Sequence, residues 1–172
     1  MSVNVYVWKP RGWGGESRRP GEARSVGHAS VEVLGSGPRI YISWWPNEAD
    51  RNTLSGQVRS GLWGVAASNH RSVPFDIGKE DHHTPHLVIL RGLNEAKIRK
   101  WWAEVRKKKT YWSLTNTNCS QMAVDALRAG GADKYLGGGS LAHYYNGHAL
   151  IWSPKEVLRY AARVKRGLQG HG

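Results

Sequence analysis

The sequence has little of several things that small exported or membrane proteins depend on. Its 172 residues include a single cysteine, Cys119, so no intramolecular disulfide can form and the usual cross-links of small secreted domains are absent. It also has no secretory h-region and no apolar run of about 18 residues. We therefore expect no signal peptide and no membrane span, and either a cytoplasmic location or secretion by a signal-peptide-independent route.

Acidic residues are scarce as well. There are 13 Asp and Glu against 25 Lys and Arg, and the net charge is +12. Such a charge attracts polyanions, which include nucleic acid, anionic lipid and acidic proteins, but it says nothing about chemistry. The basic residues are spread along the chain and form no compact motif of a known DNA reader, so nucleic acid is the less favoured partner. A non-enzymatic basic module that binds nucleic acid remains an alternative.

The pattern of polarity predicts an α+β fold in one domain. The apolar fraction of 40%, with nine tryptophans and seven tyrosines, is enough for a core. Alternating or β-rich runs predict strands at 3–8, 26–34, 39–45 and 86–90. Capping residues and apolar stripes predict helices at 93–109, around Cys119, and from 153 to about 166. We expect residues 47–70 to form a long excursion with a short helical piece.

The segment around Cys119 predicts a loop that runs into an amphipathic helix, which Gly130 and Gly131 end. At about 100° per residue, Cys119 lies at the N-terminal end of an apolar stripe. Met122, Ala123, Ala126 and Leu127 continue that stripe, whereas Ser120, Gln121, Asp125 and Arg128 fall away from it. Unpaired N–H groups and the helix dipole favour a thiolate there, although a lone cysteine can also be a small buried hydrophobe.

A cysteine nucleophile needs a base, and the base needs an orienting partner. His28 is the preferred base, because it follows a glycine at the start of the strand at 26–34 and so lies at an end of the sheet. Backbone N–H groups of Cys119 and Ser120 are natural donors to an oxyanion. The cluster of His82, His83 and His86 resembles a metal site only weakly, so we expect a solvated loop there and no metal or other cofactor.

Three blocks in the order GHASVEV, YISWWP and NCS resemble the circularly permuted papain-like proteins. The closest resemblance is to the Rho-inactivation-domain-like group of bacterial toxins and effectors, and it covers residues 26–132. It leaves 1–25 as an N-terminal strand and basic loop, and 133–172 as a C-terminal segment with a helix. The resemblance implies a permuted papain-like (NlpC/P60-type) fold, in which an antiparallel sheet packs against helices that include the cysteine helix.

The resemblance also implies the site. Cys119 would be the nucleophile and His28 the base. The toxin group has an acidic residue after the histidine, for which Asp76 is the best match and Glu80 or Asp81 are substitutes. Other permuted relatives place the orienting residue on the strand after the histidine, where this chain has Ser43. Asn118 and Ser120 flank the cysteine as supporting residues.

The implied function is a toxin or effector enzyme that acts through a thioester on acyl or amide groups, either as a lysine fatty acyltransferase or as a protease. A peptidoglycan amidase of the same fold is an alternative. The implied partners are a protein substrate in a target cell, including one associated with a membrane, and an acyl donor. Anionic lipid and a cognate immunity protein complete the expected set.

Overall fold

The computed structural model describes residues 2–10, 26–35, 37–47, 64–108, 111–138 and 151–170. The strands in these ranges are β1 (Ser2–Trp8), β2 (His28–Leu34), β3 (Ile40–Pro46), β4 (Val65–Asn69), β5 (His86–Leu90) and β6 (Tyr111–Trp112). The helices are α3 (Val73–Lys79), α4 (Glu95–Lys107), α5 (Cys119–Ala129) and α7 (Pro154–Gln169), with a short 3-10 helix η1 (Ala132–Tyr135).

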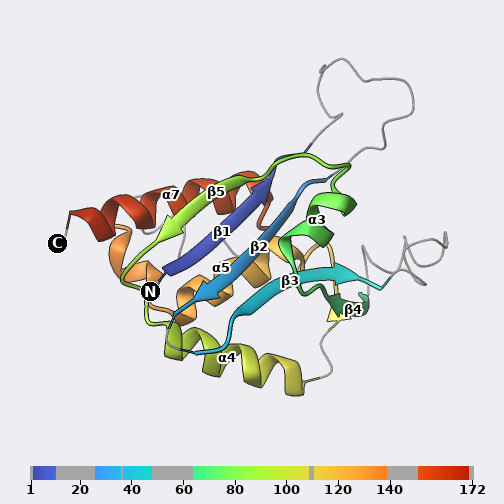
Figure 1. The fold of residues 1–172 in the computed structure, drawn as a ribbon, viewed down its shortest axis with the longest axis horizontal. Helices are drawn as coiled ribbons and strands as arrows, with labels where there is room; N and C mark the ends of the chain where they lie inside the picture. The colour runs from blue at the N-terminus through green and yellow to red at the C-terminus, as the bar shows by residue number, and fades with distance from the viewer. Residues whose placement is uncertain are drawn as a thin grey trace, which may run out of the picture.

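The strands form one sheet in the order β5-β1-β2-β3-β4-β6, and every pairing between neighbours is antiparallel. Figure 1 shows α5 and α7 on one face of the sheet and α3 on the other, over β2 and β3. The predicted α+β class with an antiparallel sheet packed against helices is confirmed for the described residues.

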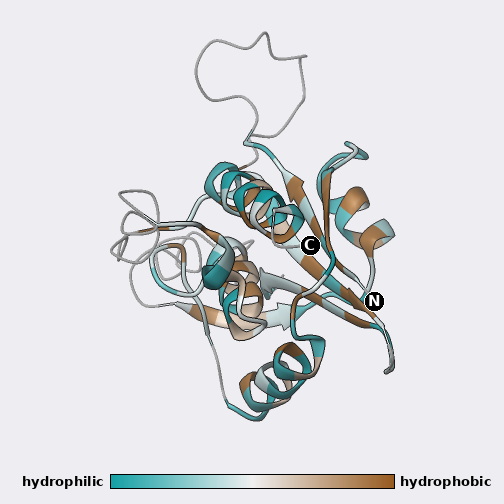
Figure 2. Cartoon of the chain, turned by 90° about the vertical axis from the view of Figure 1, so that its left-hand side faces the viewer, coloured by the Kyte–Doolittle hydropathy of each residue, from teal (hydrophilic) through white to brown (hydrophobic). Residues whose placement is uncertain are grey.

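The face of the sheet under α5 and α7 is apolar because alternate residues of each strand point to the same side. Val5 and Val31 pair across β1 and β2, and neither exposes any surface. Each such buried side chain stabilises the fold by about 1.5 to 3 kcal/mol relative to its exposed state. In Figure 2 the strands carry much of the hydrophobic colour, while the outer sides of the helices are largely hydrophilic. The core therefore lies between this face and the helices.

The opposite face of the sheet is polar yet buried. Trp8, His28 and Ser30 lie on this face, where Trp8 pairs with His28 and Ser30 pairs with Ser43 of β3. His28, Ser30 and Ser43 are each at most 1% exposed. Buried polar groups must be satisfied by hydrogen bonds, so this face has to contain an ordered polar network.

The helices with clear caps begin where the sequence predicts. Asn94 accepts a hydrogen bond from the backbone N–H of Lys97 at the start of α4. Ser153 and Glu156 form both halves of a capping box at the start of α7, with Pro154 at the first helical position. The α7 helix runs to Gln169, slightly beyond the predicted end.

Some predictions were wrong or incomplete. The excursion predicted at 47–70 contains strand β4, and the segment after it contains α3, which the polarity pattern did not reveal. Ser120, predicted to fall away from the apolar stripe of its helix, is 1% exposed. Most of the basic loop, the excursion at 48–63 and the residues at 139–150 lie outside the described residues.

Candidate active site

The start of α5 places Cys119 in the first helical turn. Asn118 is the N-cap, and its side-chain oxygen accepts from the backbone N–H of Gln121 at 2.8 Å. The Asn118 amide nitrogen donates to the carbonyl oxygens of Leu114, at 2.9 Å, and Trp152, at 3.2 Å. Because both of its N–H groups are used, Asn118 fixes the helix start and has no donor left for an oxyanion. Cys119 itself is partly buried.

The backbone at Gly27 positions His28 at the end of the sheet. Gly27 has a φ of 77°, and a Cβ at this position would lie 2.4 Å from the carbonyl oxygen of Trp8. The His28 ring stacks on Trp45 with centroids 4.2 Å apart and lies 5.6 Å from the ring of Trp8. The imidazole is therefore held between two indoles, which fix its orientation and exclude water.

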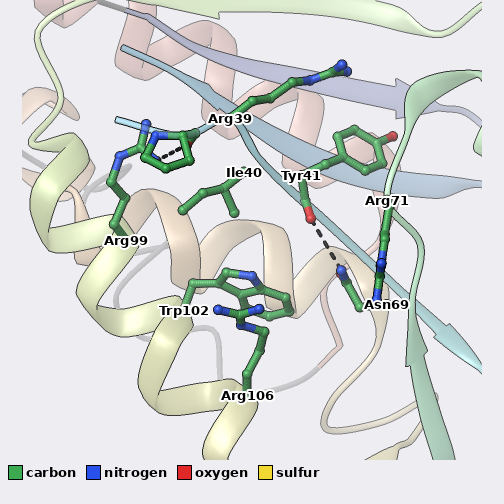
Figure 3. A pocket seen from close by; sticks show the side chains of 9 residues that line it. Arg39, Ile40, Tyr41, Asn69, Arg71, Arg99, Trp102 and Arg106 are labelled. Atoms are coloured by element: carbon green, nitrogen blue, oxygen red, sulfur yellow. Dashed lines mark hydrogen bonds between the residues drawn. The ribbon is translucent and has the colours of Figure 1, made fainter. Parts of the chain in front are cut away.

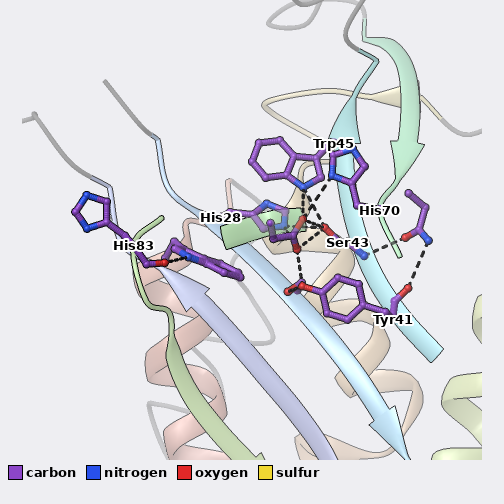
Figure 4. A network of polar contacts seen from close by, with 10 residues as sticks. His28, Tyr41, Ser43, Trp45, His70 and His83 are labelled. Carbon is purple, nitrogen blue, oxygen red and sulfur yellow. Dashed lines mark hydrogen bonds and ion pairs between the residues drawn. The ribbon is translucent and has the colours of Figure 1, made fainter. Parts of the chain in front are cut away.

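Asp76 and Ser43 complete the network around His28 (Figure 4). His28 Nε2 lies 3.0 Å from Ser43 Oγ and 3.3 Å from Asp76 Oδ2. Ser43 Oγ donates to Asp76 at 2.7 Å, which leaves the Ser43 oxygen to accept from His28 Nε2. Ser43 and Asp76, which the sequence offered as alternative orienting partners, thus both contact His28. Since Nε2 is used, Nδ1 is the ring nitrogen left for a thiol.

Two aromatic residues of β3 hold the Asp76 carboxylate. Tyr41 donates its hydroxyl to Asp76 Oδ2 at 2.5 Å, and Trp45 donates its indole N–H to Asp76 Oδ1 at 3.0 Å. His70 Nδ1 lies 3.5 Å from Asp76 Oδ1, at the outer limit of a hydrogen bond, and its ring stacks against Trp45. A carboxylate that accepts several hydrogen bonds stays ionised even when buried.

The Cys119 thiol meets the sheet where β2 and β3 diverge. Pairing between these strands begins at Ser30 and Ser43, and the backbone of Ala29 is one of the groups that lower the pKa of Cys119. The His28 ring and Cys119 interact electrostatically, and each shifts the pKa of the other. The sulfur at the helix start and the imidazole at the end of the sheet therefore lie near enough for each to shift the pKa of the other.

The electrostatics of the site favour a thiolate beside an imidazolium. Burial favours the neutral thiol, but the charge of His28 and hydrogen bonds from His28 and Ala29 outweigh burial and lower the pKa of Cys119. Burial also favours neutral histidine, but the charge of Cys119 and hydrogen bonding to Asp76 raise the pKa of His28 from 6.5 to about 9. Against burial, the nearby imidazoles of His28 and His70 and the Tyr41 hydroxyl hold the pKa of Asp76 well below its ordinary value.

The remaining predicted site residues differ in what they contact. The Ser120 hydroxyl is buried and has no hydrogen-bond partner among the described residues, and it is one of the groups that lower the pKa of Cys119. Glu80 is buried at the C-terminal end of α3, whereas Asp81 is exposed with a φ of 53°. Of the three acidic candidates, Asp76 contacts His28. Glu80 and Asp81 lie beyond the C-terminal end of α3, the helix that carries Asp76.

Sequence reasoning missed Tyr41, Trp45 and His70. Tyr41 and Trp45 are two residues either side of Ser43, so they share its face of β3, and that spacing could have identified them. His70 follows β4, which the sequence did not predict, so no pattern pointed to it.

Among the described residues, no group of three or more metal-binding side chains comes together. None of the helices within those ranges combines the length and the apolar character needed to cross a bilayer.

Comparison with known proteins supports the resemblance. The sequence profile of the IcsB middle domain matches residues 54–170, well over half of the chain. The chain belongs to the IcsB middle domain family. This match includes Asp76 and Cys119 but begins after His28, so the assignment of His28 to the site depends on the geometry described above.

This chain also resembles a multifunctional-autoprocessing repeats-in-toxin protein of Vibrio vulnificus. The two are 25% identical over 92 residues, which cover 53% of this chain and 2% of the toxin. The chain thus spans a small fraction of that curated relative. No solved structure matches the chain. The prediction of a bacterial toxin or effector group is confirmed by the family and this relative.

Proposed function

We propose that this chain is a papain-like cysteine enzyme that forms a thioester on Cys119 and passes the acyl group to a lysine side chain of a protein in a target cell. The observation that carries the proposal is the set of contacts from Asp76 through Ser43 to His28, together with the electrostatic interaction between His28 and the Cys119 thiol. A thiolate at a helix start, an oriented imidazole and a buried carboxylate are the parts that nucleophilic acyl transfer requires.

The geometry suggests how each proton moves. His28 Nδ1 takes the Cys119 proton, and the Ser43 and Asp76 oxygens stabilise the imidazolium through Nε2. The thiolate attacks the carbonyl carbon of an acyl donor, and the backbone N–H groups of Cys119 and Ser120 receive the oxyanion because they have no partner within the helix. The leaving group takes the proton from His28 as the thioester forms.

The second half of the reaction transfers the acyl group. A lysine amine attacks the thioester carbonyl, His28 accepts the proton that the amine loses, and Cys119 leaves as a thiolate. Burial of His28 between Trp8 and Trp45 limits the access of water, which would hydrolyse the thioester. Lysine fatty acyl transfer is one of the activities that the toxin resemblance implies, and protein cleavage is the other.

The acyl-transfer proposal predicts two successive covalent products. When the protein is mixed with a fatty acyl thioester, its intact mass should increase by one acyl group that hydroxylamine removes, because the link is a thioester. Addition of a lysine-containing peptide should then give a peptide with a hydroxylamine-resistant acyl amide. Both products can be followed by mass spectrometry, with a peptide in which arginine replaces lysine as the control.

Cleavage of a peptide bond in the acceptor without acylation would show a protease instead. Absence of any adduct on Cys119 with a range of chain lengths would contradict the acyl-transfer proposal.

A further inference from the structure

A hollow with a volume of about 620 Å³ lies between β3, the residues after β4, and α4. Figure 3 shows its lining side chains. Arg99, Trp102 and Arg106 come from one side of α4, where their spacing of three and four residues aligns them. Arg71 enters from the segment after β4, and Ile40 lies on the β3 side. We call this hollow, defined by these residues, the arginine groove.

Within the part of the chain that the structure describes, three arginines of the groove have no acidic partner. A fourth arginine at its edge, Arg39, bonds Glu32 Oε1 through its Nε, and Figure 3 shows its side chain directed away from Arg99 and Arg106. Among the described residues, Arg71, Arg99 and Arg106 have no carboxylate within ion-pair distance. Like charges gathered in one hollow repel each other, so a bound anion would relieve a cost already present in the fold.

Arg99 is held in place by the backbone. One of its terminal nitrogens, Nη1, donates to the carbonyl oxygen of Pro38. A Cβ on Gly37 would lie 3.2 Å from Arg99 Cζ, so the glycine makes room for the guanidinium. The other terminal nitrogen, Nη2, is buried and has no hydrogen-bond partner among the described residues. A buried donor without a partner is costly, and this one belongs to a group that binds phosphate oxygens in pairs.

The shape of the groove limits the ligand. Its volume falls within the range of about 300 to 1,000 Å³ that is typical of small-molecule sites. Trp102 is 2% exposed and forms an apolar base with Ile40, so the anionic part of a ligand would meet the guanidinium groups around that base. An extended nucleic-acid duplex does not fit a hollow of this size, whereas a compact phosphorylated group does.

We propose that the arginine groove binds a compact ligand that carries two or more neighbouring phosphate groups. The shared chemistry is a phosphorylated headgroup, which can belong to an anionic lipid or to a free polyphosphate. Cys119, His28 and Asp76 do not line the groove, although Tyr41, which does, donates its hydroxyl to Asp76. This binding site goes beyond the proposed acyl transfer and does not require Cys119.

Binding to the full chain tests the proposal. Titration calorimetry with inorganic pyrophosphate and inositol trisphosphate should show binding that falls at least about tenfold in Arg99→Gln/Arg106→Gln, because each lost guanidinium removes charge-assisted hydrogen bonds. The matched control is Lys155→Gln/Arg159→Gln, which removes the same charge from exposed positions on α7 and should change affinity less than about twofold. Circular dichroism of both variants checks their folding.

Vesicles distinguish the two sources. Phosphatidylcholine vesicles that contain phosphatidylinositol bisphosphate are compared with phosphatidylserine vesicles of equal surface charge. If the groove variant loses binding to the soluble ligands, the result supports the proposal and assigns a free polyphosphate. If it loses binding only to the bisphosphate vesicles, the result supports the proposal and assigns a lipid headgroup. Equal losses in the groove and control variants, or no loss in either, would overturn the proposal. Binding measured on Cys119→Ala should match the wild type, so this result is independent of the proposed enzyme activity.

Discussion

Replacing Cys119 by alanine should abolish acyl-enzyme formation and lower the turnover of any acyl substrate by at least about 10⁴-fold. The physical reason is that the thiolate is the atom that forms the covalent bond, and no other cysteine exists in the chain to replace it. The measurement is intact mass after incubation with the acyl donor, together with the rate of product formation. Stability should change little, because the side chain is small and partly buried.

The matched control for Cys119→Ala is Gln121→Ala on the same helix. Gln121 bonds Asp125 rather than the site, so this variant should keep turnover within about twofold of the wild type. Equal losses in both variants would point to disruption of α5, and full activity in Cys119→Ala would rule out the nucleophile.

The second large effect is expected for Asp76→Asn. We expect kcat/KM to fall by about 10³- to 10⁴-fold, because the amide no longer stabilises the His28 imidazolium. In the wild type, Tyr41, Ser43 and Trp45 donate hydrogen bonds to the carboxylate. In the variant, the N–H groups of the asparagine amide would face these same donors. Asp76 is fully buried, so removing its charge from the network should lower the free energy of unfolding by about 3 kcal/mol at neutral pH. Urea unfolding and steady-state kinetics measure the two effects.

The sign of the pH dependence follows from the lowered pKa of Asp76. Its contribution to stability is fully present above its ordinary pKa of 3.8 and is lost as pH falls toward the lower folded value. The gap in unfolding free energy between wild type and Asp76→Asn should therefore narrow in acid. A gap that stays constant or widens as pH falls would contradict the ionised network.

Glu32→Gln provides the control that separates stability from catalysis. Glu32 is also buried on the polar face of the sheet, but it bonds Asn4, Tyr6 and Arg39 rather than His28. This variant should lose stability yet keep kcat/KM within about threefold of wild type. An equal loss of activity in Glu32→Gln would show that Asp76 acts only by stabilising the sheet.

Much of the site could be predicted because local rules fix it. The alternation at 26–34 predicts a strand that begins near His28, and the capping pattern before Cys119 predicts a helix that begins at the thiol. The resemblance supplied Asp76. The sequence left open whether Ser43 or Asp76 orients the histidine. In the structure Ser43 contacts His28 and donates a hydrogen bond to Asp76.

The elements that escaped prediction lack an apolar signature. Helix α3 has seven residues, includes Gly78, and buries Asp76 rather than an apolar stripe, so hydrogen bonds to the sheet stabilise it in place of hydrophobic periodicity. Strand β4 has the sequence VAASN, in which Val65 is the one β-branched residue. The aromatic residues at 41 and 45 were hidden because both faces of β3 are buried, which removes the contrast between the faces.

The most direct test of the thiolate–imidazolium pair is the pKa of His28, measured by nitrogen NMR on histidine-labelled protein and assigned with His28→Gln. The wild type should keep His28 protonated at neutral pH and titrate at about 9. In Cys119→Ala the pKa should fall by at least about one pH unit, because burial then acts without the opposing charge of the sulfur. The same pKa in both proteins, or a neutral His28 at neutral pH in the wild type, would contradict the pair on which the proposed chemistry depends.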